Sequence, residues 1–89
     1  MTKESFIKKR SYLFWYVQNP RKVSDEALVE AVLNYGDFDD VKKMLRIVGF
    51  SRARDIFFAN ARKPRHNYDP KIKHYFELFF NTYASGNTV

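Results

Sequence analysis

Two glycines, Gly36 and Gly49, divide the middle of this 89-residue chain into three short amphipathic segments. The segments cover residues 25–35, 38–48 and 52–62. In each segment mainly apolar side chains recur at i, i+3, i+4 and i+7, the period of a helix with one buried face. Because isolated helices of this length are marginally stable, the three must pack on one another. The sequence therefore predicts a three-helix unit at the centre of the fold.

The residues next to each segment set its expected ends. Ser24, Asp37 and Ser51 are N-cap residues that can accept a hydrogen bond from the first turn of the following helix. Gly36 is expected to close the first helix in the left-handed conformation, and Gly49 to end the second. The expected buried faces are Leu28, Ala31, Val32 and Tyr35 in the first helix, Val41, Met44, Leu45 and Val48 in the second, and Ala53, Ile56, Phe57 and Asn60 in the third.

One further helix is expected on each side of this unit. Thr2 can cap the first, which we extend to about Tyr16. The apolar run at residues 12–17 is also compatible with a short strand, because periodicity alone does not separate the two. Asp69 followed by Pro70 is a strong start signal for the last helix.

These elements predict an all-α fold, a compact bundle of about five short helices with a central unit like a helix-turn-helix. We expect residues 1–84 to form a single helical domain and residues 85–89 to form a disordered C-terminal tail. No apolar run approaches the roughly 18 residues of a membrane span, and no signal-peptide core follows the basic N-terminus. We therefore expect a cytoplasmic protein without membrane association.

Composition narrows the classes of function. The chain has no cysteine, which excludes disulfides, thiol catalysis and cysteine-based zinc sites. Nine Phe, six Tyr and one Trp are more aromatic residues than a core of this size readily buries, so we expect some at an interface. The net charge of +6 is uneven, since residues 1–45 carry eight basic and seven acidic side chains and residues 46–89 carry eight and three. Such a polarised charge can steer a charged partner.

Few residues suit catalysis or metal binding. His66 and His74 lack the spacing of a metal motif, and no glycine-rich loop can hold a phosphate. Asp37, Asp39 and Asp40 suit the positive end of a helix, and they lack the ligand spacing and the terminal glutamate of a calcium loop. We therefore expect a non-enzymatic protein with no metal and no cofactor.

Nucleic-acid binding is one interpretation of the middle of the chain. Residues 44–58 fit a helix-turn-helix in part, with residues 48–50 at the turn. Two positions depart from the pattern. Leu45 stands where a small residue normally lets the two helices cross closely, and Asp55 stands where an apolar residue normally anchors the second helix.

A basic stripe supports the same interpretation. At ~100° per residue, Arg54, Phe58 and Arg62 form one stripe opposite the buried face of their helix. Other cations near the stripe are Arg52, Lys63 and Arg65. Together they can contact phosphates, while Phe58 stacks on a base or supports an arginine. Alternatively, Phe58 packs beneath the N-terminal segment and the arginines surround it.

Aromatic side chains dominate the last helix. Its apolar face covers an arc near ~140°, formed by Ile72, Tyr75, Phe76, Phe79, Phe80 and Tyr83, and Leu78 widens it. A terminal helix on a small bundle needs a narrower face. Either this helix sits deep in the bundle with the run at residues 12–17 against it, or part of its aromatic face docks a partner.

Several short motifs occur in the order typical of a known group of proteins. They are Leu13-Phe14-Trp15, the Tyr35-Gly36-Asp37 turn within residues 32–40, Val48-Gly49, the helix end at residues 60–62, and the segment from Tyr75-Phe76 to Phe79-Phe80. In these motifs the chain resembles small helical proteins of uncharacterised function that are encoded beside abortive-infection-type nucleotidyltransferase toxins in bacteria and archaea. At two positions it differs from them, because Tyr16 replaces an Asp and Tyr75-Phe76 replaces Phe-Trp.

The resemblance implies an antitoxin or accessory subunit that binds a nucleotidyltransferase and that can also repress its own operon. Under this leading hypothesis the apolar anchors of the interface are Trp15, Tyr16, Phe58, Tyr75 and Phe80. The residues expected to pair with carboxylates or phosphates are Arg52, Arg54 and Arg62. The alternative is a small DNA-binding helix-turn-helix protein that uses the basic face of residues 46–73. A homodimer is compatible with both.

Overall fold

The computed structural model describes residues 2–15, 17–64 and 68–82, and no strand occurs among them. Their helices are α1 (Lys3–Lys8), α2 (Asp25–Tyr35), α3 (Phe38–Val48), α4 (Phe50–Ala61) and α5 (Pro70–Thr82), together with a short 3₁₀ helix, η1 (Pro20–Lys22). The predicted all-α fold with about five helices is confirmed. None of the helices in the described ranges is long and apolar enough to cross a membrane. The tail expected at residues 85–89 lies outside the described residues.

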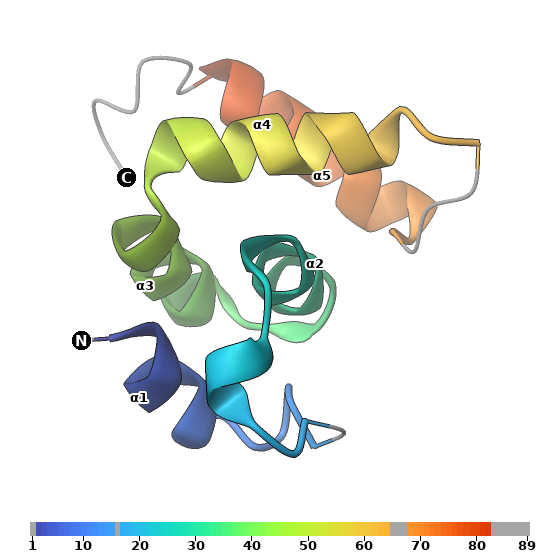
Figure 1. Cartoon of the computed structure of the whole chain (residues 1–89). Helices are drawn as coiled ribbons and strands as arrows, with labels where there is room; N and C mark the ends of the chain where they lie inside the picture. The colour runs from blue at the N-terminus through green and yellow to red at the C-terminus, as the bar shows by residue number, and fades with distance from the viewer. Residues whose placement is uncertain (1, 16, 65–67, 83–89) are drawn as a thin grey trace.

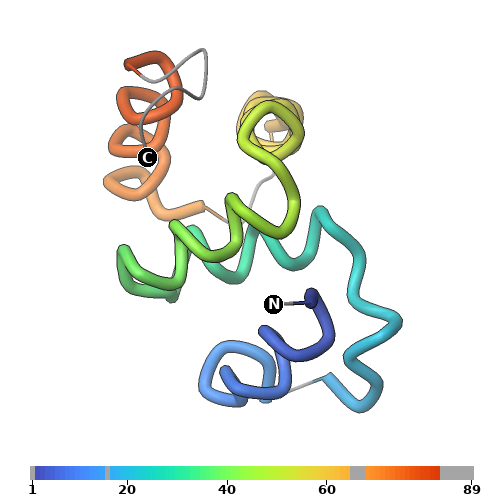
Figure 2. Tube along the Cα trace, turned by 90° about the vertical axis from the view of Figure 1, so that its left-hand side faces the viewer, coloured from blue at the N-terminus to red at the C-terminus, as the bar shows by residue number. Residues whose placement is uncertain are grey.

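Helix α2 lies at the centre of the arrangement and packs against α3, α4 and α5. Figures 1 and 2 show α1 and η1 together on one side of α2 and α3, and α4 and α5 on the other. The N-terminal helix therefore contacts η1, while α5 contacts α2 and α4. The alternative in which the run at residues 12–17 packs against the last helix is wrong for the described residues of that run, because α2 and α3 lie between them and α5.

The three middle helices bury the faces that their spacing predicts. Leu28 and Val32 of α2, Met44 of α3, and Ala53 and Phe57 of α4 are completely buried. Each large apolar side chain that becomes buried contributes about 1.5–3 kcal/mol, so these faces hold the central unit together. The ends of the predicted faces depart from the pattern: Tyr35 is 76% exposed at the last position of α2, and Val48 and Asn60 are half-buried.

The predicted N-caps of α2 and α3 are confirmed. Ser24 Oγ accepts a hydrogen bond from the Ala27 N–H at 3.1 Å. Asp37 Oδ1 accepts one from the Asp40 N–H at 2.8 Å, and Asp40 Oδ2 in turn accepts one from the Asp37 N–H at 3.1 Å. This reciprocal pair is a capping box. The expected caps of the outer helices also form, with Thr2 accepting from Ser5 and Asp69 accepting from Lys71.

The two glycines have different physical roles. Gly49 has φ +97° and serves both as the C-cap of α3 and as the N-cap of α4, so Ser51 lies inside α4 and is not its cap, contrary to the prediction. The predicted left-handed conformation of Gly36 is also wrong, because its φ is −79° and its ψ is 160°. A Cβ at Gly36 would lie 2.8 Å from the Val32 carbonyl oxygen and 3.0 Å from Asp40 Cβ. Gly36 therefore provides room for a tight connection between α2 and α3.

The first helix is shorter than predicted. Helix α1 ends at Lys8, and the chain continues in tight turns rather than as a helix to about Tyr16, which is itself outside the described residues. The Leu13 N–H, for example, bonds the Arg10 carbonyl at 2.9 Å. Arg10 and Tyr12 both bond the carboxylate of Asp40, so tertiary hydrogen bonds hold this segment in place.

Candidate functional site

A surface of exposed aromatic and aliphatic side chains joins the start of α3 to α5. Phe38, Tyr75 and Leu78 are 51%, 52% and 56% exposed, and Phe79 is buried beneath them. The Phe38 and Phe79 rings meet edge to face with 6.2 Å between centroids, and the Tyr75 and Phe79 rings stack at 6.5 Å. We call these four residues the α3–α5 aromatic surface.

The wide apolar arc of α5 explains why part of it remains exposed. Phe76, Phe79 and Phe80 face the core, where they are buried against α2 and α4. Tyr75 and Leu78 lie on the adjacent side of the same helix, which the neighbouring helices do not cover. One part of the apolar arc of α5 is therefore buried in the core, and the other part is exposed to solvent. Sequence reasoning included Tyr75 but missed Phe38, whose exposure follows from its place at the start of α3.

The edges of the α3–α5 aromatic surface are basic. The Lys42 ammonium lies 5.9 Å from the centre of the Phe38 ring, within range of a cation–π contact. Lys71 is exposed one helical turn before Tyr75. Within the described ranges neither lysine has an ion-pair partner, whereas the nearby Asp39 is paired with Lys43 at 2.9 Å. An acidic group on a partner can therefore meet unpaired cations here.

A second feature is a groove between the end of α4 and α5, with a volume of about 530 Å³. Its lining residues, which we call the α4–α5 groove, are Phe58, Ala61, Arg62, Lys63, Pro64, Lys73 and Glu77. Three cations therefore face one acid. The Arg62 guanidinium carbon lies 5.9 Å from the centre of the Phe58 ring. The tertiary structure adds Lys73 to the predicted cluster of Phe58, Arg62 and Lys63.

Phe58 is half-buried, and its ring packs on aromatic neighbours. Its centroid lies 5.2 Å from that of Phe57 and 6.3 Å from that of Phe80, on α5. Phe58 therefore packs within the fold, with Arg62 beside its ring. The expected neighbour was wrong, because Phe58 packs against α5 and not beneath the N-terminal segment.

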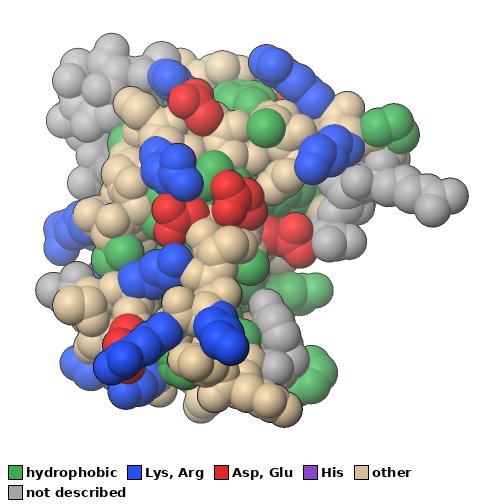
Figure 3. Space-filling model, viewed as in Figure 1, with side chains coloured by type: hydrophobic (Ala, Val, Ile, Leu, Met, Phe, Trp, Pro, Cys, Tyr) green, Lys and Arg blue, Asp and Glu red, His purple; other side chains and the backbone are tan. Residues whose placement is uncertain are grey.

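The other two predicted contact arginines of α4, Arg54 of the stripe and Arg52 near it, lie beside acidic side chains. Arg52 Nε donates to Asp25 Oδ2 at 2.9 Å, and Lys3 donates to the other oxygen at 3.2 Å. The hydrogen bond from Arg52 lowers the pKa of Asp25 further than burial raises it. Arg54 lies 3.5 Å from Asp55. Figure 3 shows acidic side chains in the middle of this face with basic ones above and below them. Arg52 is therefore not part of the α4–α5 groove.

The remaining predicted contact residues do not form one surface. Phe80 is completely buried, so its predicted role as an interface anchor is wrong. Trp15 is 81% exposed, but its segment lies with α1, across α2 and α3 from Tyr75. Tyr16 and Arg65 lie outside the described residues.

A buried ion pair that sequence reasoning missed connects the N-terminal segment to α3. Arg10 is 7% exposed, and its Nε donates to Asp40 Oδ1 at 2.7 Å. The Tyr12 hydroxyl donates to Asp40 Oδ2 at 2.7 Å, and the guanidinium carbon of Arg10 lies 4.0 Å from the centre of the Phe6 ring. Arg10 stands four residues from both Phe6 and Phe14, which are buried. A charged residue at a position where the helical spacing of Phe6 and Phe14 predicts an apolar one was the sequence signal that could have revealed this buried ion pair.

These contacts also shift the pKa values of Asp40 and Tyr12. Burial raises the pKa of Asp40, but the hydrogen bonds from Arg10, from Tyr12 and from the Asp37 N–H together lower it more, so the net shift is downward. The hydrogen bond to Asp40 raises the pKa of Tyr12. Asp40 is thus held ionised as a structural group.

The acidic cluster at the start of α3 is explained by these contacts. Carboxylate oxygens of Asp37, Asp39 and Asp40 lie within 4.8 Å of one another, close enough for metal ligands. Asp37 caps α3, however, while Asp39 pairs with Lys43 and Asp40 with Arg10. The interpretation of these acids as helix-start residues agrees with this geometry.

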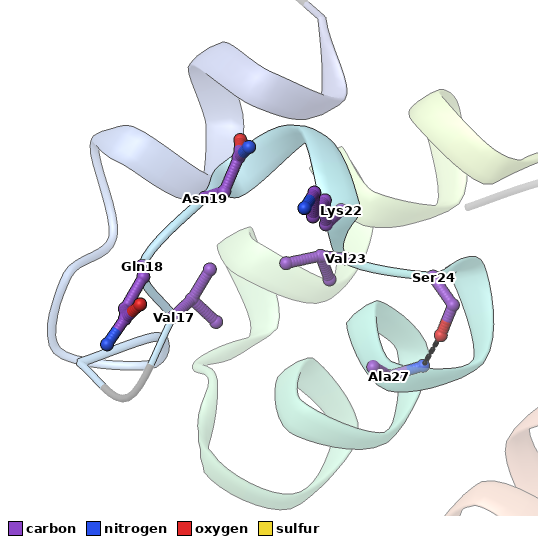
Figure 4. Close-up of a pocket in the computed structure, with 7 residues that line it drawn as sticks. All are labelled: Val17, Gln18, Asn19, Lys22, Val23, Ser24 and Ala27. Carbon is purple, nitrogen blue, oxygen red and sulfur yellow. Dashed lines mark hydrogen bonds between the residues drawn. The ribbon is translucent and has the colours of Figure 1, made fainter.

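A hollow of about 380 Å³ lies beside η1, and Figure 4 shows its seven lining residues. Lys22 is the ionisable side chain among them, and Ser24 Oγ accepts the capping hydrogen bond from Ala27. These seven residues include no histidine and no carboxylate that could form a triad with the serine. The expectation of a non-enzymatic protein stays a prediction.

Comparison of the chain with protein-family models, with curated proteins and with solved structures gave no match. The resemblance to helical proteins encoded beside nucleotidyltransferases therefore stays a prediction from short motifs.

Proposed function

We propose that this chain is a non-catalytic binding protein that captures a protein partner on the α3–α5 aromatic surface. The observation that carries the proposal is that Phe38 and Tyr75, each more than half exposed, both contact the ring of Phe79. Leu78, also more than half exposed, lies three residues after Tyr75 on the same side of α5. Large side chains of this kind provide most of the energy of protein interfaces, where they act as anchors in the dry centre. Covering the exposed halves of three such side chains is worth about 2–4 kcal/mol.

The basic edge of this surface specifies the chemistry of the partner. Lys42 and Lys71 lie beside Phe38 and Tyr75 without ion-pair partners in the described part of the chain. A partner segment with apolar side chains flanked by Asp or Glu would place acids against both lysines. Complementary charges at the rim of an interface speed association and select against partners of the wrong charge.

The partner suggested by the sequence resemblance is a nucleotidyltransferase of the abortive-infection type, with this chain as its antitoxin or accessory subunit. This assignment depends on the resemblance, whereas the docking surface depends on the geometry of α3 and α5. An experiment on the two purified proteins tests both.

The test measures, by isothermal titration calorimetry, the dissociation constant between this chain and the protein encoded beside its gene, which the proposal expects to be a nucleotidyltransferase. The double variant Tyr75→Ser/Leu78→Ser should bind at least ~30-fold more weakly, the loss expected from one hot spot of about 2 kcal/mol. Both side chains are more than half exposed, so the variant should remain folded, which circular dichroism checks.

Trp15→Ser is the matched control, because Trp15 is 81% exposed on the other side of the molecule. It should change the dissociation constant less than about threefold, because it removes no contact of the docking surface. The absence of a complex would refute the partner. A complex that tolerates the double variant, or that Trp15→Ser weakens equally, would refute the surface.

A further inference from the structure

The α4–α5 groove brings together cations from two elements that are separate in the sequence. Arg62 and Lys63 follow the end of α4, and Lys73 lies in the first half of α5. Among the described residues none of the three has an ion-pair partner, although Glu77 lines the same groove. Four of the other basic residues near α1 to α4, by contrast, are paired with acids: Lys3, Arg10, Lys43 and Arg52. Three cations without ion-pair partners in the described residues therefore meet in this one groove.

Helix electrostatics explains only part of this concentration. Cations at the C-terminal end of a helix are favourable, which accounts for Arg62 and Lys63 after α4. The N-terminal end of α5 favours acids instead, yet its first turn contains none, and Lys71 and Lys73 are its second and fourth residues. Lys73, which lines the groove, raises the positive potential there and favours an anionic ligand.

In the α4–α5 groove the Phe58 ring supports the Arg62 guanidinium and is not free to stack on a base. Phe58 packs on Phe57 and Phe80, and the Arg62 guanidinium lies over its ring at 5.9 Å. Contact with the ring limits the positions of a long, flexible side chain, so Arg62 loses less freedom when it binds a phosphate. The groove is thus arranged for the backbone of a nucleic acid and not for its bases.

The geometry favours a single strand over a duplex. A helix-turn-helix protein reads duplex DNA with a protruding second helix whose first residues reach the bases. In α4 the residues at that end are Arg52, paired with Asp25, and Arg54, which lies 3.5 Å from Asp55. The unpaired cations line a concave groove at the other end of α4, and a positively charged groove is the usual device for binding a single strand. We propose that the α4–α5 groove binds the sugar–phosphate backbone of single-stranded nucleic acid, independently of the protein-docking surface.

The test uses the full chain and fluorescently labelled single strands of oligouridylate and oligothymidylate about 12 nucleotides long, the length of one small binding site. Fluorescence anisotropy gives the dissociation constant between about 50 and 200 mM salt. Three phosphate contacts predict a slope of log K against log salt near −2. The double variant Arg62→Ala/Lys73→Ala should reduce the slope to about −0.7 and weaken binding at least ~10-fold at the lowest salt.

Two further variants separate a specific groove from general attraction to a basic protein. Lys42→Ala/Lys71→Ala removes the same net charge from the α3–α5 aromatic surface and should weaken binding less than about threefold. Glu77→Gln removes the acid from the groove and should tighten binding by roughly two- to threefold, the scale of one charge–charge contact in water.

Several results would overturn the proposal. They are the absence of binding at low salt, equal losses in the two double variants, weaker or unchanged binding by Glu77→Gln, and tighter binding of a duplex than of the single strands. Equal competition by a poly-glutamate peptide at matched charge would also overturn it, since the groove would then recognise acidic chains in general.

Discussion

Replacing Arg10 with Met should destabilise the fold strongly, although the substitution keeps the length and apolar stem of the side chain. It leaves the Asp40 carboxylate, which is 3% exposed, without its cation. Tyr12 at 2.7 Å and the Asp37 N–H at 3.1 Å would remain as hydrogen-bond donors, but neither carries a charge. Leaving one member of a buried ion pair unpaired typically costs about 3–5 kcal/mol. A domain of this size has a total stability of only about 4–13 kcal/mol.

The assay is urea unfolding followed by far-ultraviolet circular dichroism, with thermal unfolding as a second measurement. A loss of 3 kcal/mol or more corresponds to a fall of at least ~12 °C in Tm for a domain of this length. A fall in stability below about 1 kcal/mol would refute the reasoning, because it would mean that water or a rearranged side chain solvates Asp40 at little cost.

A double-mutant cycle isolates the pair itself. Asp40→Leu also removes the acceptors for Tyr12 and for the Asp37 N–H, so alone it combines a lost cap with an unpaired Arg10. The variant Arg10→Met/Asp40→Leu leaves neither charge buried, so it should be at least about 2 kcal/mol more stable than the sum of the two single losses predicts. Additive losses would contradict a direct coupling between Arg10 and Asp40.

Two other predictions concern the same region. The pKa of Asp40 is lowered in the folded state, so the stability that its carboxylate contributes is present above the unfolded pKa near 4 and is lost as pH falls through the folded pKa. Urea unfolding between about pH 7 and 2 should show this loss of stability, and Asp40→Asn should make its dependence on pH shallower. Parallel stability curves for the two proteins would contradict the assignment to Asp40. Gly36→Ala should lower the free energy of unfolding by about 1–3 kcal/mol, because its Cβ would lie 2.8 Å from the Val32 carbonyl oxygen. This clash outweighs the gain of about 0.4–1 kcal/mol that comes from a stiffer unfolded chain. A urea midpoint equal to or higher than that of the unsubstituted protein would contradict the prediction, because it would show that the connection between α2 and α3 shifts easily.

The sequence by itself determined the parts of this protein that depend on neighbours within about four residues. The apolar spacing predicted helices over residues 25–35, 38–48 and 52–62, and the structure has them at 25–35, 38–48 and 50–61. Ser24 and Asp37 start two of them through hydrogen bonds to the next turn. Such contacts form whenever the segment is helical. The same spacing placed Phe58 and Arg62 on one stripe with Lys63 nearby, because they lie within two turns of α4 and its end. It also placed Arg54 on that stripe, and Arg54 does not line the groove.

Only the tertiary structure decided which member of a helix face is covered and which charge finds a partner. Phe80 and Tyr75 belong to one aromatic arc, yet one is completely buried and the other is 52% exposed, because α2 and α4 cover part of the arc. Arg10 meets Asp40 across 30 residues, and Lys73 joins Arg62 from another helix. Burial and pairing depend on which helices lie side by side, and this follows from how the whole core is filled rather than from the period of any one segment.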